Sequence, residues 1–76
     1  MKTKILWDDK HTTVKQTTTR TTVIRHYDDT KDIITHLDND TGDRLISDMR
    51  CADNDPNSMP AHYITRHVRD LYPILD

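Results

Sequence analysis

The chain has 76 residues, of which 33% are hydrophobic, and its formal net charge is −2 at pH 7. A chain of this length forms one domain, residues 1–76, and buries only roughly 60% of the surface that its unfolded form exposes. Such a small core leaves little room for an enclosed catalytic cleft, so the composition favours a binding protein over an enzyme.

The single cysteine, Cys51, excludes an internal disulfide. Small secreted domains usually need paired cysteines, and no stretch has the apolar character of a signal peptide or of a membrane span of about 20 residues. We therefore expect a cytoplasmic protein that does not contact a membrane. Dimerisation would bury more apolar surface, so a homodimer stays open as an oligomeric form.

All 13 acidic residues are Asp, and Thr occurs 12 times. Asp favours turns and caps because its short side chain bonds to nearby backbone amides. Thr is branched at Cβ and favours strands. The composition therefore predicts sheet and turns with little helix.

In chain order, the first predicted element is a strand over 2–7, and a turn over 8–11 follows it. The run 12–27 favours β structure throughout and contains no Gly or Pro. At about 3.3 Å per residue it would span roughly 53 Å as one strand, which is too long for this domain. We expect a bend or a break near the polar Thr17–Thr19 tract, and whether the run is one bent strand or two stays open.

Two further strands are predicted over 32–37 and 44–49. The turn between them, 38–43, holds the only glycine of the chain, Gly42. In the predicted register Leu37 lies opposite Leu45, and Ile33 lies opposite Met49.

A loop over 51–57 is predicted next, and Ser58 is the predicted N-cap of a helix over 61–72. Ile64, Val68 and Leu71 form one apolar stripe on this helix. The predicted fold is α+β: a small antiparallel β-meander of three to five strands with one C-terminal amphipathic helix packed on one face.

No catalytic or metal-binding pattern stands out in the sequence. The Asp-rich segment around Gly42 has no terminal Glu, as a calcium loop requires, and the five histidines are not spaced as zinc ligands. Cys51 has no nucleophile signature around it, and one glycine cannot build a phosphate-binding loop. We therefore expect no enzymatic activity, no metal and no cofactor.

The charges are segregated along the chain. Residues 1–27 carry a net charge of +4, residues 28–58 carry −6, and the remaining residues balance. The simplest interpretation is that basic strands and acidic turns neutralise each other in the fold. The alternative is a charged partner surface.

The favoured functional hypothesis is a small non-catalytic protein-binding module that inhibits or modulates a host protein, such as a nucleic-acid-processing or defence protein. The predicted partner-binding residues are Asp38, Asp40, Asp43, Asp53 and Asp55, which would meet a basic surface of the partner. Turn chemistry alone is the competing interpretation of these Asp residues. In size and character only, the chain is similar to the small anti-defence inhibitors encoded by phages and mobile elements.

The alternative hypothesis is a small nucleic-acid-binding β-sheet domain. Lys15, Arg20 and Arg25 alternate with Thr hydroxyls and would contact phosphates, while Tyr27 would stack on a base. The net charge of −2 counts against this hypothesis, because nucleic-acid-binding domains are usually basic.

Overall fold

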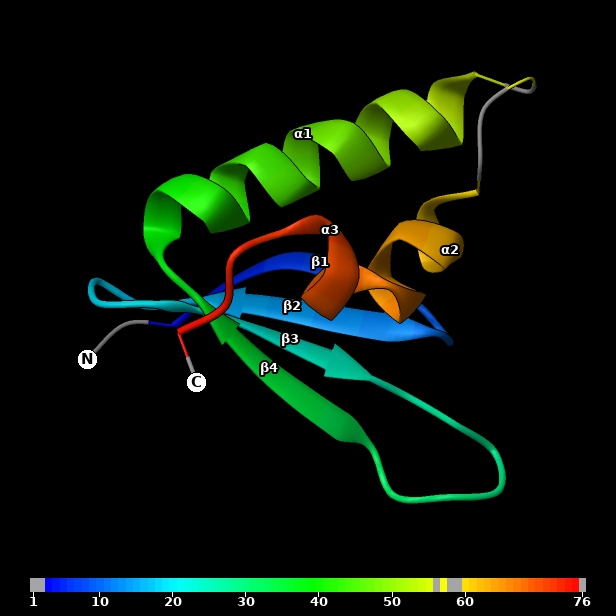
Figure 1. The fold of residues 1–76 in the computed structure, drawn as a ribbon, viewed down its shortest axis with the longest axis horizontal. Coiled ribbons are helices and arrows are strands. Elements are labelled where there is room, and N and C mark those ends of the chain that lie inside the picture. The colour runs from blue at the N-terminus through cyan, green and yellow to red at the C-terminus, as the bar shows by residue number, and fades with distance from the viewer. Residues whose placement is uncertain (1–2, 56, 58–59, 76) are drawn as a thin grey trace.

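The computed structural model describes residues 3–55, 57 and 60–75. Within these residues, four antiparallel strands form one sheet in chain order: β1 (Lys4–Asp8), β2 (Thr12–Gln16), β3 (Thr21–Arg25) and β4 (Ile33–Leu37). Three helices follow, α1 (Asn39–Asn54), α2 (Ala61–Arg66) and α3 (Val68–Leu71). Figure 1 shows that the helices lie on one face of the sheet. The predicted α+β class and the antiparallel meander are confirmed.

The run 12–27 contains two strands, β2 and β3, which pair with each other in a hairpin. The turn between them is closed by the Thr17 N–H, which donates to Arg20 O at 2.9 Å. The Thr17 hydroxyl also accepts the N–H groups of Thr19 and Arg20, both at 3.3 Å. A threonine side chain thus stabilises a turn that has no glycine, and the predicted break near Thr17–Thr19 is confirmed.

The predicted turn over 38–43 and the predicted strand over 44–49 are wrong, because these residues belong to the 16-residue helix α1. Asp38 is the N-cap of α1, and its carboxylate accepts the Thr41 N–H at 2.7 Å. An Asp that favours a turn is therefore used here to start a helix. The first residues of the predicted loop 51–57 are also helical, since α1 ends at Asn54.

The buried side of α1 shows why the strand prediction failed. Leu45 and Met49 are four residues apart, a spacing that fits both one side of a strand and one side of a helix. Ile46 and Ala52 are buried as well, which only the helical period explains. The predicted Leu37–Leu45 and Ile33–Met49 pairs therefore do not form, and Leu37 pairs with Thr21 of β3.

The predicted helix over 61–72 is present as two short helices that meet at His67. The His67 N–H is shared between Tyr63 O at 3.3 Å and Ile64 O at 3.2 Å, so the helix tightens and changes direction there. Ile64 and Val68 are buried as predicted, whereas Leu71 is 53% exposed, and its predicted place in the buried stripe is wrong. The predicted N-cap, Ser58, lies outside the described residues.

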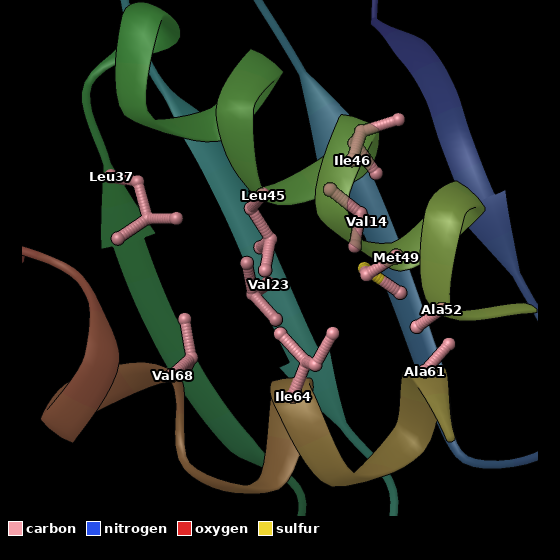
Figure 2. Close-up of a cluster of buried hydrophobic side chains, with 10 residues drawn as sticks. All are labelled: Val14, Val23, Leu37, Leu45, Ile46, Met49, Ala52, Ala61, Ile64 and Val68. Carbon is pink, nitrogen blue, oxygen red and sulfur yellow. The ribbon is translucent and has the colours of Figure 1, made fainter. Parts of the chain in front are cut away.

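The core lies between the sheet and the helices (Figure 2). It contains ten buried apolar residues, namely Val14, Val23, Leu37, Leu45, Ile46, Met49, Ala52, Ala61, Ile64 and Val68. Buried Thr side chains lie among them, and their hydroxyls find partners: Thr12 with Thr65 at 2.7 Å, and Thr21 with Asn39 at 3.0 Å. Because these hydroxyls are hydrogen-bonded, a Thr-rich sheet can bury one face at little polar cost.

The opposite face of the sheet has no helix over it among the described residues (Figure 1). The cross-strand register places Ile5, Lys15, Thr22 and His36 in one row across this face. Ile5 is 60% exposed. The homodimer considered above stays a prediction. No helix in the described part of the chain is both long enough and apolar enough to cross a membrane.

Candidate functional site

The five Asp residues predicted to bind a partner fall into two groups at opposite ends of α1. Asp38, Asp40 and Asp43 lie at its N-terminus, and Asp53 and Asp55 lie at its C-terminus. A helix rises about 1.5 Å per residue, so the two groups are roughly 20 Å apart. All five side chains are exposed, but the fold does not gather them on one surface.

The N-terminal group has structural roles within the chain. The hydroxyl and the N–H of Thr41 both interact with the Asp38 carboxylate and lower the pKa of Asp38. Asp43 accepts a hydrogen bond from Gln16 Nε2 at 3.0 Å, which links α1 to the sheet. Asp40 lies in the first helical turn, where the helix dipole favours a negative charge. Helix formation accounts for Asp38 and Asp40, and the attachment of α1 to the sheet accounts for Asp43.

Helix formation does not account for the C-terminal group. The carbonyl end of a helix carries a partial negative charge, so basic residues are favoured there. The last turn of α1 has no basic residue, and Asp53 lies within it. Asp55, the C-cap, accepts the Asn57 N–H at 3.0 Å. The two carboxylates thus add to the negative potential at this end of α1.

Asp53 and Asp55 line an open hollow, here named the acidic hollow. Its opposite wall is formed by the end of β1, the turn between β1 and β2, and the start of α2, which contribute Trp7, Asp9, His11 and His62. The fold thus brings together two of the five predicted residues with a third carboxylate, Asp9. Sequence reasoning placed Asp9 in a turn and missed it as a site residue.

Asp9 is held in place by three hydrogen bonds. Its Oδ1 accepts the N–H groups of His11 at 2.7 Å and Thr12 at 2.8 Å, and its Oδ2 accepts Trp7 Nε1–H at 2.7 Å. Burial raises the pKa of Asp9, but these hydrogen bonds outweigh burial and hold the pKa below its ordinary value. Asp9 is therefore ionised at neutral pH and fixes the indole of Trp7. The sequence signal is an Asp followed by a hairpin turn, where free amides need an acceptor.

Two histidine rings form the other side of the acidic hollow. The ring centroids of His11 and His62 are 4.6 Å apart. Burial lowers the pKa of His62, and electrostatic interactions with His11 and Arg25 lower it further, although Asp9 opposes them. His62 is therefore neutral at pH 7, and it does not offset the carboxylates of Asp9, Asp53 and Asp55.

The four residues of the nucleic-acid hypothesis do not form one surface. Lys15 lies on the uncovered face of the sheet, opposite Thr22 of β3, and Arg20 is exposed in the turn between β2 and β3. Arg25 is buried on the other face, towards the helices. Tyr27 is half-buried, and its ring centroid is 5.4 Å from Cζ of Arg25.

Comparisons with protein families, with curated proteins and with solved structures find no match for this chain. Among the described residues, no cluster of three or more His, Cys or Asp side chains is arranged to hold a metal ion. The acidic hollow is therefore judged on its own geometry.

Proposed function

We propose that this chain is a non-catalytic protein-binding module of the inhibitor or adaptor kind, which docks onto a basic surface of its partner through the acidic hollow. One observation carries the proposal: Asp9, Asp53 and Asp55, from separate parts of the chain, line one hollow together with the only Trp of the chain. The partner group that fits is an Arg or Lys side chain.

Charge and shape both support a cationic occupant. Carboxylates accept charge-assisted hydrogen bonds from a guanidinium or an ammonium group, and the C-terminal end of α1 adds its own negative potential. The indole of Trp7 offers an aromatic face, on which a cation gains further attraction. The hollow has a volume of ≈ 390 Å³, which accommodates a long side chain without a large rearrangement. A negative surface of this kind also speeds association with a basic partner.

Titration with a hexa-arginine peptide tests the proposal directly. Trp7 is the only Trp, so its fluorescence reports binding in the hollow without a label. We expect a saturable change with hexa-arginine and none with hexa-glutamate. The double variant Asp53→Asn/Asp55→Asn should bind hexa-arginine about tenfold or more weakly, because both charged acceptors are lost.

A matched control separates the acidic hollow from net charge. The variant Asp28→Asn/Asp29→Asn removes the same charge from the exposed connection between β3 and β4, and it should bind as the wild type does. The triple variant Asp38→Asn/Asp40→Asn/Asp43→Asn tests the other end of α1 in the same way. Equal weakening by the Asp53/Asp55 and Asp28/Asp29 pairs would contradict the proposal, since it would show attraction to total charge alone.

Affinity capture of partners then tests the function itself. The tagged wild type and the Asp53→Asn/Asp55→Asn variant are used as bait in parallel, with and without nuclease. We expect a discrete protein that survives nuclease and is lost with the variant. Recovery of nucleic acid that depends on Lys15 and Arg20 would instead support the nucleic-acid alternative.

A further inference from the structure

A second hollow, here named the basic hollow, lies on the other side of α2. It is formed between strands β3 and β4 and helices α2 and α3, and the residues that matter for its chemistry are Arg25, Tyr27, Thr65, Arg66, Arg69 and Asp70. Three guanidinium groups thus face one carboxylate. An adjoining hollow shares Arg25, Tyr27 and Arg66 and adds Lys10 and Asp28, so basic side chains outnumber carboxylates there as well.

Arg25 is the unusual member of this group. Arg25 is 8% exposed, and the side-chain hydrogen bonds that it makes to the described residues all come from one nitrogen, Nη1. Nη1 donates to Thr12 Oγ1 at 3.3 Å, to Thr65 Oγ1 at 3.1 Å and to the backbone oxygen of His62 at 3.0 Å. All three acceptors are neutral.

The other edge of the guanidinium has no partner in the described part of the chain. Arg25 Nε is buried and has no hydrogen-bond acceptor. The ion pairs found in residues 3–55, 57 and 60–75 are His26–Asp32 and His67–Asp70, and neither includes Arg25. A buried charge without a counter-charge is costly, and a buried donor without an acceptor adds to the cost. An anion in the basic hollow would supply the missing counter-charge beside the Arg25 guanidinium.

The neighbouring groups are arranged to complete an anion site. Arg69 is fixed over β4, because its Nε donates to Thr35 Oγ1 at 3.3 Å and its Nη2 donates to Ile34 O at 3.4 Å. Arg66 is exposed and lines the rim of the same hollow. The hollow has a volume of ≈ 240 Å³, which is smaller than the roughly 300–1,000 Å³ of sites for drug-sized ligands. It therefore suits one small charged group.

We propose that the basic hollow binds a phosphate monoester group, with Arg25 as its buried anchor and Arg66 and Arg69 at its rim. A monoester carries close to two negative charges at pH 7 and has three acceptor oxygens, which matches several guanidinium groups. Arginine is suited to this task because its planar fork pairs two donors with two oxygens. A carboxylate or a phosphodiester carries one charge and would leave the excess of positive charge in place.

Titration with phenyl phosphate at constant ionic strength tests the proposal, followed by ¹H–¹⁵N NMR of the backbone and of the arginine Nε–H groups. We expect saturable shifts at Thr65 and Arg66 and at the Arg25 Nε–H signal. Inorganic phosphate should shift the same signals, whereas acetate and oligothymidine should bind more weakly. Arg66→Gln should raise the dissociation constant about fivefold or more, and Arg66→Lys should recover part of the loss.

Arg44→Gln is the matched control, since Arg44 is an exposed arginine on α1, and it should leave the dissociation constant unchanged. Arg25→Gln should abolish binding. If that variant fails to fold, Arg66→Gln still decides the question. The proposal would be overturned if Arg66→Gln and Arg44→Gln weakened phosphate binding equally. It would also be overturned if phosphate shifted no signal near Arg25. Tighter binding of oligothymidine than of phenyl phosphate at the same signals would replace the monoester with a nucleic-acid backbone.

Discussion

Gly42 of α1 lies so close to Thr21 of β3 that a Cβ atom on residue 42 would be 2.1 Å from Thr21 Oγ1. Thr21 is fully buried, and its hydroxyl is held between Gln16 Nε2, which donates to it at 3.1 Å, and Asn39 Oδ1, which accepts from it at 3.0 Å. Thr21 therefore has no room to move. The first turn of α1 can reach the sheet only because residue 42 has no side chain.

Gly42→Ala should destabilise the protein, although Ala favours a helix. Helix propensity alone favours Ala over Gly by about 1 kcal/mol, and overpacking a closed contact costs about 1–3 kcal/mol or more. We expect a net loss of about 1–2 kcal/mol, measured by urea denaturation. Ser47→Ala, on the exposed side of α1, is the control and should gain a few tenths of a kcal/mol. Equal stability of the two variants would contradict the close approach of α1.

Gly42 also shows where sequence reasoning stops. Asp and Gly are turn formers, so the segment Asp38–Asp43 predicts a turn when it is read alone. The same Asp38 becomes a cap once the following residues form a helix. Only a longer stretch of sequence, which includes Ala52, distinguishes the helical spacing of apolar residues from the alternation typical of a strand. The strands up to Leu37 lie within the predicted β-favouring runs, although the run 12–27 has no Gly or Pro to mark the turn between β2 and β3.

The candidate sites were predictable only in part. The acidity of Asp53 and Asp55 is visible in the sequence, but Trp7 and Asp9 join them only because the fold places β1 and the β1–β2 turn across a hollow from the end of α1. The buried position of Arg25 follows from the face of β3 that meets the helices, since Val23 and Arg25 are buried and alternate with half-buried positions. That face could not be assigned while the sequence left open whether 12–27 was one strand or two.

A pair of substitutions tests the placement of the C-terminal helices. Val68 is 5% exposed, so Val68→Asp would bury a charge with no partner and should unfold a domain whose stability margin is about 3–5 kcal/mol. Leu71 is 53% exposed, so Leu71→Asp should change stability by no more than about 0.5 kcal/mol. Thermal melting followed by circular dichroism measures both. Similar melting curves for the two variants would show that the break at His67 does not turn Leu71 outward.

Asp9 should make stability fall in acid. The pKa of Asp9 in the folded chain lies below the ordinary value of 3.8, so the unfolded chain binds the proton first as the pH falls. The contribution of ionised Asp9 to the free energy of unfolding is therefore fully present above pH 3.8. It is lost as the pH falls through the pKa that Asp9 has in the folded chain. Asp9→Asn keeps an oxygen for the His11 and Thr12 amides but cannot ionise, and its amide cannot replace the acceptor of Trp7 Nε1–H.

Asp9→Asn should therefore be less stable than the wild type at neutral pH. Between about pH 5 and about pH 2, the urea concentration at the unfolding midpoint should fall less for Asp9→Asn than for the wild type. Trp7 fluorescence follows unfolding in both proteins. Asp29→Asn, in the exposed connection between β3 and β4, should keep the acid response of the wild type. An equal loss of midpoint in the wild type and in Asp9→Asn would mean that protonation of Asp9 is not coupled to folding, and that the hydrogen bonds from Trp7, His11 and Thr12 to Asp9 do not stabilise the β1–β2 turn.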